Sequence, residues 1–229
     1  MKERGMIFNG EMVRAILDGR KTQTRRIMKV QPEPSKSRPG DFWFSSKKLE
    51  SMVHISDFAP GNSPIADYHL FIQEHCCPFG AVGDRIWVRE TWARYNIDQN
   101  SHDLAYRATT PADWPEEGRW RPSIHMPRWA SRILLEITNV RIERLNAISP
   151  EDAESEGLER TNFTGFGDEP GLPSYPEPDV YFDPLKKQWK EYPPEAFAGL
   201  WESIYGEGSW KANPWVWVIE FKRVEGGAA

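Results

Sequence analysis

The sequence Gly-Arg-Lys-Thr-Gln-Thr-Arg-Arg-Ile at residues 19–27 marks the point where a short amphipathic helix gives way to a strand of unusually polar composition. Ahead of it, apolar side chains recur at the spacing of one helical face, namely Met12, Val13, Ile16 and Leu17. Asn9 is a favourable N-cap for this helix, and Gly19 suits the left-handed residue that follows its last turn. The sequence therefore predicts a helix that ends at Gly19 and directs the next residues into a strand.

Both faces of that strand carry polar side chains. Because side chains alternate along a strand, Thr22, Thr24 and Arg26 share one face. Such a strand is either a solvated sheet edge or the wall of a polar cavity. Lys21 lies in the preceding turn, from which its amine can curl back toward Thr24. A lysine beside a threonine can serve as base and nucleophile, and neighbouring arginines disfavour protonation of the amine.

The composition limits the classes of protein that need to be considered. The 229 residues carry a net charge of −5, so no global basic field is present to hold long nucleic acid. Cys76 and Cys77 are the only cysteines, and adjacent cysteines rarely form a structural disulfide, so we expect a reducing, cytoplasmic environment. The sequence has no signal-peptide pattern and no long apolar run, and we expect no membrane partner.

A metal site is the alternative interpretation of the segment that contains these cysteines. His69 and His75 lie near them in the sequence. However, neither a Cys-x-x-Cys pair nor a His-Glu-x-x-His helix is present, and these are the spacings that zinc sites use. We therefore expect ordinary thiols in a loop, with no metal and no cofactor.

Clusters of proline, glycine and serine divide the chain. We expect a single domain over residues 1–229 with loop insertions at about 31–80, 109–123 and 159–193. The last insertion is rich in glycine, proline and acidic residues, which favours a lid that the core of the domain does not need.

A turn at Gly83 and Asp84 precedes a predicted strand over residues 85–92, in which apolar and basic side chains alternate. Its side chains Trp87, Arg89 and Trp92 are candidates to stack on a base or to contact a phosphate. The alternative is an ordinary sheet with solvated arginines. His125, further along, has a side chain suited to proton transfer at neutral pH, but a lone histidine is more often structural, so we retain it only as a binding candidate.

The second half of the chain contains three clear elements. Residues 133–145 alternate as one long or bulged strand, residues 194–205 form a helix with one apolar face, and residues 215–221 form a strand apolar enough for the middle of a sheet.

Residues 149–157 give the strongest local helix signal in the sequence. Ser149 is a good N-cap, Pro150 fits the first helical position, and Gly157 fits the residue after the last turn. This places Glu156 at the helix C-terminus, where the dipole disfavours negative charge. A carboxyl group in that position is suited to hold a proton, although an ordinary surface glutamate is the simpler interpretation.

The segment at residues 19–27 resembles the signature of the ASCH domain, a branch of the PUA-like superfamily, with the pattern Gly-x-Lys-(Thr)-x-(Thr or Glu)-x-Arg. The landmarks at residues 19–27, 83–90, 149–158 and 215–224 follow the order seen in bacterial N4-acetylcytidine amidohydrolases of that superfamily, and the chain is also similar to larger phage and prophage ASCH proteins. The resemblance implies an α+β fold, a PUA-like mixed β-barrel with flanking helices. It covers the barrel and not the long insertions.

The resemblance also implies roles for individual residues. Lys21 matches the proton acceptor, Thr24 the nucleophile, and Glu156 the proton donor of the amidohydrolases. The remaining substrate-binding candidates are the polar, aromatic and basic side chains Arg20, Thr22, Arg26, Trp87, Arg89, Trp92 and His125. The expected activity is removal of the N4-acyl group from a cytidine-like nucleoside, with a modified nucleoside or RNA as partner.

Two other functions remain open from the sequence. One is a non-catalytic reader of RNA or of modified bases that uses the same cavity, and the other is an ASCH-type ribonuclease. Ring deamination is disfavoured because the His-x-Glu and Pro-Cys-x-x-Cys signature of zinc deaminases is missing.

Overall fold

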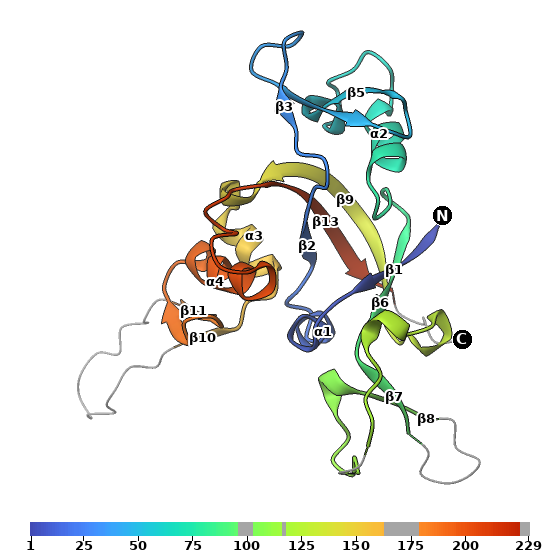
Figure 1. Ribbon diagram of the computed structural model, residues 1–229, viewed down its shortest axis with the longest axis vertical. Helices are drawn as coiled ribbons and strands as arrows, with labels where there is room; N and C mark the ends of the chain where they lie inside the picture. The colour runs from blue at the N-terminus through green and yellow to red at the C-terminus, as the bar shows by residue number, and fades with distance from the viewer. Residues whose placement is uncertain (96–102, 116–117, 163–178, 225–229) are drawn as a thin grey trace, which may run out of the picture.

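The computed structural model describes residues 1–95, 103–115, 118–162 and 179–224. Its centre is a five-stranded sheet in the order β1-β6-β9-β13-β2 (Figure 1). These strands span Glu3–Ile7 (β1), Arg85–Arg89 (β6), Leu134–Arg144 (β9), Trp215–Arg223 (β13) and Gln23–Ile27 (β2). Only β1 and β6 pair in parallel, and the other neighbours are antiparallel.

Helix α1 (Gly10–Leu17) joins the two edge strands β1 and β2. The Asn9 side chain accepts a hydrogen bond from the Met12 amide at 2.8 Å, and Gly19 has a φ of +76°, so both predicted helix ends are confirmed. Between the edge strands, the Arg26 guanidinium donates to the Ile7 carbonyl at 2.8 Å. A side chain, rather than a ladder of main-chain hydrogen bonds, therefore connects β1 with β2.

The mixed α+β class is confirmed, but a closed barrel is not. The described strands form four separate sheets, and none of these closes on itself. The predicted central strand is confirmed, because β13 lies between β9 and β2 and is buried on both faces. Trp217 and Ile219 pack in one apolar cluster, and Val216 and Val218 pack in the other.

The segment at residues 31–80 is folded rather than an insertion of loops. It contains β3 (Glu33–Pro34), β4 (Phe42–Ser46), β5 (Ser51–His54), the 3-10 helix Ile55–Phe58 and α2 (Tyr68–Cys76). Phe44 and Phe58 pack edge-on against Trp217 at centroid distances of 6.2 and 5.5 Å. Aromatic packing on the central sheet thus orders a segment whose prolines and serines indicated loops.

The strand predicted over residues 85–92 divides in two. Strand β6 ends at Arg89, and β7 (Trp92–Tyr95) pairs instead with β8 (Asp103–Tyr106) in a separate two-stranded sheet. Trp92 is 1 % exposed and packs with Met126 and Ala130 in a small cluster of its own. Short 3-10 helices at Arg107–Thr109, Ser123–His125 and Arg128–Ala130 complete this part of the chain.

The remaining elements lie to one side of the central sheet (Figure 1). They are the 3-10 helix Leu145–Ala147, α3 (Pro150–Ser155), β10 (Arg160–Asn162), β11 (Asp179–Asp183), β12 (Gln188–Lys190) and α4 (Pro193–Tyr205). Tyr181 of β11 is buried in the same cluster as Phe197 and Trp201 of α4. The described part of residues 159–193 therefore contributes to the core. In the described parts of the chain, no helix has the length and apolarity to cross a membrane.

Candidate functional site

A buried ion pair joins the two segments that the sequence singled out. The Lys21 amine donates to a carboxylate oxygen of Glu156 at 2.7 Å and to the Glu156 main-chain carbonyl at 2.8 Å. Lys21 is 2 % exposed and Glu156 is 3 % exposed. The surface-glutamate interpretation of Glu156 is therefore wrong.

Local structure explains why these two residues meet. The Ser149 hydroxyl caps α3 by accepting from the Asp152 amide at 3.1 Å, and Glu156 is the C-cap of this helix. The Thr22 amide donates to the Ser155 carbonyl at 2.9 Å, and an isolated bridge pairs Lys21 with Glu156. The end of α3 is thus fastened beside the start of β2 by its main chain as well as by its side chains.

Gly157 permits this close approach. It has a φ of +90°, and a Cβ at this position would lie 2.8 Å from both Ala15 Cβ and Lys21 Cβ. Because real Cβ atoms do not come so near, only glycine allows the Lys21 side chain to pass beside the helix end.

Burial determines the protonation behaviour of Lys21. Loss of hydration lowers the pKa of the Lys21 amine below its ordinary value, while the Glu156 carboxylate opposes this shift, and the positive charges of Arg26 and Arg25 add to it. A buried lysine of lowered pKa more readily takes the neutral form that accepts a proton.

Arg25 was not among the residues that we singled out from the sequence. Its side chain is 0 % exposed and donates to Glu156 at 3.2 Å, to Asp152 at 2.7 Å and to Glu143 at 3.1 Å. Arg141 of β9 also contacts Asp152 at 2.6 Å, and it contacts Glu143 and Glu220. The result is a network of charges behind Glu156, spread over β2, β9, β13 and α3.

The network has two consequences for the site. Burial favours the protonated form of Asp152, but hydrogen bonds and charge from Arg25 and Arg141 hold the pKa of this carboxyl below its usual value. Arg25 and Lys21 each contact a different oxygen of Glu156, which fixes the plane of that carboxylate. The sequence does contain a signal for this network, namely the charged residues at 141–144 and the arginine at position 25 of β2. That signal can be recognised only when the pairing of β2, β13 and β9 is known.

Thr24 lies on the face of β2 opposite to Arg25. It is paired in register with Ile219, whereas Arg25 is paired with Val218. Thr24 is 1 % exposed. It lines a cavity of about 20 Å³ together with Arg25, Arg26 and Glu156. That volume holds about one water molecule.

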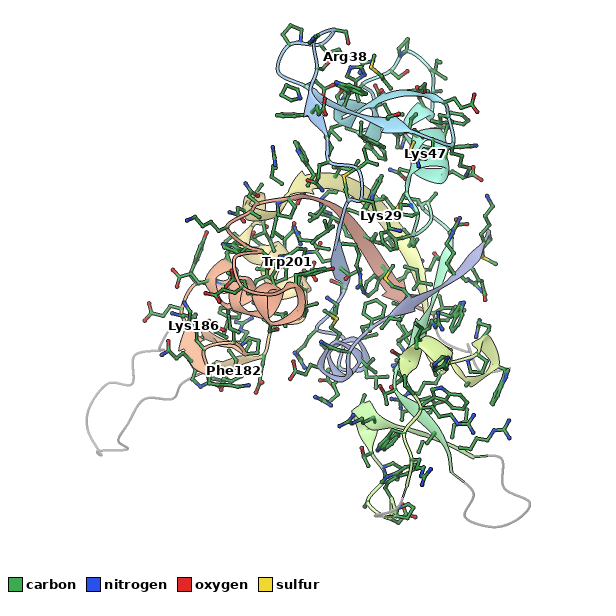
Figure 2. The ribbon with its side chains drawn as sticks, in the orientation of Figure 1. Lys29, Arg38, Lys47, Phe182, Lys186 and Trp201 are labelled. Atoms are coloured by element: carbon green, nitrogen blue, oxygen red, sulfur yellow. The ribbon has the colours of Figure 1, made fainter. Side chains whose placement is uncertain are left out.

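A larger cavity of about 160 Å³ adjoins the small one. Met12, Glu156 and Leu200 line both. Arg20 borders the larger cavity, where its guanidinium donates to the carbonyls of Gly157 and Leu158 at 2.9 and 3.2 Å. Phe182, labelled in Figure 2, lines the same cavity. Thr22 is exposed and contributes main-chain hydrogen bonds to Ser155 and Phe221.

The aromatic and histidine candidates lie elsewhere. Trp87 and Arg89 stack on each other on β6, with the guanidinium carbon 5.4 Å from the ring centroid. Trp92 is buried in its own cluster, and His125 is exposed on a 3-10 helix. None of these residues lines either cavity at Glu156. The structure therefore brings together Lys21, Thr24, Glu156, Arg20 and Arg26, but not Trp87, Arg89, Trp92 or His125.

Cys76 and Cys77 are free thiols, and burial raises the pKa of Cys77 to about 12. Among the described residues, no group of three or more histidine, cysteine or acidic side chains is placed to hold a metal ion. The chain matches no protein-family model, no curated protein and no solved structure.

Proposed function

We propose that the protein is an amidohydrolase that removes the N4-acyl group from a cytidine-like nucleoside. The observation that carries this proposal is the buried Lys21–Glu156 pair at 2.7 Å, bordered by a cavity that Thr24 also lines. These three residues match the ASCH amidohydrolase signature. The ASCH assignment and its PUA-like fold are part of the proposal, and the side-chain contact between Arg26 and Ile7 across the two sheet edges supports a barrel-like curvature.

The proposed acid–base chemistry depends on which member of the Lys21–Glu156 pair holds the proton. Lys21 and Glu156 share one proton along their hydrogen bond, either as an ion pair or as a neutral amine beside a neutral acid. In the neutral form, Lys21 takes the proton of the Thr24 hydroxyl as its oxygen attacks the acyl carbonyl. Glu156 then gives its proton to the departing amine as the C–N bond breaks. The pair is left as an ion pair, and transfer of one proton along the hydrogen bond restores it. Water then hydrolyses the acyl ester on Thr24 and frees the acid.

The cavity at Thr24 places a condition on this function. At about 20 Å³ it admits an acyl oxygen but not a nucleoside. One wall of it is built by α4 side chains, namely Phe197, Leu200, Trp201, Ile204 and Tyr205. We therefore propose that α4 side chains move when substrate binds and that the base occupies the larger cavity at Arg20.

Hydrolysis of N4-acetylcytidine, followed as release of cytidine, tests the proposal. Thr24→Val keeps the branched shape and removes only the hydroxyl, so it should abolish turnover without loss of the folded state. Thr110→Val is the matched control, because Thr110 is exposed and lines neither cavity at Glu156. Full turnover by Thr24→Val would refute the assignment of the nucleophile. A short RNA incubated in parallel tests the ribonuclease alternative.

The reader alternative gains no support from the arrangement of the aromatic residues. A reader that uses this cavity was expected to stack bases on Trp87 and Trp92, but neither lines it, and Trp92 is 1 % exposed. For that reason we do not propose it as a second function.

A further inference from the structure

Three residues that line the small cavity at Thr24 carry side-chain N–H donors that have no acceptor among the described residues. The side-chain nitrogens Arg25 Nε, Arg26 Nε and Trp201 Nε1 are all buried, and none has a hydrogen-bond partner among the described residues. All three residues line the cavity of about 20 Å³. Figure 2 shows Trp201 on α4, on the side of this helix that lies toward β2.

Such an arrangement is unusual, because buried polar groups are nearly always hydrogen-bonded. A buried donor without a partner destabilises the folded protein. The Arg25 guanidinium lies over Phe197 of α4, the helix that carries Trp201, whereas Arg26 reaches Phe8 and the Ile7 carbonyl instead. The Trp201 and Arg25 donors therefore have a common explanation if a ligand in the cavity supplies the acceptor. The acceptor must be small, because the cavity has room for about one water-sized atom group.

The surroundings specify the kind of acceptor. Arg25 and Arg26 supply positive charge, although Arg25 is already paired with three carboxylates. Glu156 lines the same cavity and would repel a free carboxylate. A neutral carbonyl oxygen that gains negative charge during a reaction suits both conditions.

We infer that Trp201 Nε1, with Arg25 Nε, forms a binding site for the acyl carbonyl oxygen of the substrate. This inference rests on the proposed function, and it assigns Trp201 and Arg25 a role that the ASCH signature does not contain. The acyl oxygen occupies the small cavity, beside Thr24, while the base lies in the larger cavity that shares Glu156. Donors placed in this way stabilise the oxyanion that forms when Thr24 attacks.

Trp201→Phe is the decisive variant, because it keeps an aromatic ring and removes the N–H donor. We expect kcat for N4-acetylcytidine to fall about 10²-fold, the usual effect of losing one such donor, with KM nearly unchanged. The folded state should be as stable as the wild type or more stable, because the lost donor had no partner. Trp215→Phe is the matched control: Trp215 Nε1 is also buried without an acceptor, but Trp215 does not line the cavity. It should leave kcat unchanged.

A second measurement does not depend on turnover. The indole ¹⁵N–¹H resonance of Trp201, assigned by its absence from Trp201→Phe, should move downfield when N4-acetylcytidine is added to the Thr24→Val protein. Cytidine, which lacks the acyl oxygen, should not move it, and the Trp215 resonance should stay fixed. Acetamide, at high concentration, serves as the probe that carries the acyl oxygen without the nucleoside.

The outcomes separate this inference from the proposed function. If N4-acetylcytidine is hydrolysed but Trp201→Phe keeps its kcat, the oxyanion site is refuted and the amidohydrolase stands. If N4-acetylcytidine is not hydrolysed but acetamide shifts the Trp201 resonance, the acyl-oxygen site stands and the nucleoside substrate is wrong. A shift caused equally by cytidine, or no shift with any of the three probes, overturns the inference.

Discussion

The amine of Lys21 lies 2.7 Å from a carboxylate oxygen of Glu156, a residue 135 positions further along the chain. Both side chains are almost completely withdrawn from water. The pair therefore joins the start of β2 to the end of α3, and it also holds the proton that the proposed reaction needs. Stability and activity are linked at this contact, so variants at Lys21 or Glu156 have to be examined for both.

Lys21→Met should destabilise the protein by about 3–5 kcal/mol, the usual cost of removing one partner of a buried ion pair. The variant leaves Glu156 buried beside Arg25 as its remaining cationic partner. The double variant Lys21→Met/Glu156→Gln should recover part of this loss, because no buried carboxylate that has lost its lysine partner remains. Urea unfolding of the four proteins of this cycle gives the coupling free energy. If the two changes in the free energy of unfolding simply add, the Lys21–Glu156 contact contributes nothing to stability.

Glu156→Gln should reduce kcat by at least about 10²-fold with little change in KM, since an amide keeps the size of the carboxyl group but has no acidic proton to donate. Steady-state kinetics with N4-acetylcytidine provide the measurement. A loss confined to KM would instead assign Glu156 to substrate binding.

Gly157→Ala should be more damaging than Gly19→Ala. Both glycines follow a helix and have positive φ values, +90° and +76°, so each substitution carries the strain of a left-handed alanine, about 1–2 kcal/mol. At Gly157 the added methyl group would lie 2.8 Å from Lys21 Cβ. At Gly19 no atom lies within 4 Å of the position that the methyl group would take. The extra loss of stability, measured by thermal unfolding, reports the displacement of Lys21 and Ala15, which both lie 2.8 Å from the added methyl group. Equal losses at the two sites would show that the helix end can move away from the lysine.

The lowered pKa of Lys21 predicts how stability depends on pH. Between that lowered value and the ordinary 10.5, the unfolded chain holds a proton on Lys21 that the folded protein has released. The free energy of unfolding should therefore rise with pH across this window. Cys77 acts in the opposite sense, because its pKa is 9.0 when unfolded and about 12 when folded, so its contribution is lost as the pH rises above 9.

Cys77 contributes equally to the wild type and to Lys21→Met, so its contribution cancels when the free energy of unfolding of one protein is subtracted from that of the other. Measured by urea unfolding from neutral pH to about pH 10, this difference should grow in favour of the wild type. A flat difference would mean that the Lys21–Glu156 pair releases no proton across this pH range, contrary to the lowered pKa of Lys21.

Local sequence signals predicted the parts of the fold that local interactions determine. Asn9 and Ser149 cap their helices because a short polar side chain reaches the next free amides, and Gly19 and Gly157 end them because few other residues adopt positive φ. The apolar run of β13 reflects burial on both faces. The meeting of Lys21 and Glu156 was expected only through the family resemblance, since no local signal relates residues so far apart.

The errors arose where tertiary packing outweighed local composition. Trp87 and Trp92 were assigned to one strand, but the chain leaves the central sheet after Arg89 and carries Trp92 into another sheet. Tyr68–Cys76 is a helix within the segment where loops were expected, and its buried Ile72 belongs to the same apolar cluster as Trp217. The role of Arg25 was not predicted, because its three acidic partners are distant in the sequence. They lie on β9, within α3 and at the end of α3.

Truncation within residues 159–193 provides the last test, because the described part of this segment contributes to the core. Tyr181 is 5 % exposed and packs with Phe197 and Trp201, so deletion of the whole segment should remove about 2–5 kcal/mol of core packing and lower the unfolding temperature sharply. A shorter deletion should be tolerated: Asn162 and Asp179 are paired in register on β10 and β11, and an Asn-Gly turn can replace residues 163–178 between them. Calorimetry of both variants decides the matter. If the short deletion also abolishes cooperative unfolding, residues 163–178 contribute to the core as well; if the long deletion unfolds like the wild type, Tyr181 is not the packing residue that its burial indicates.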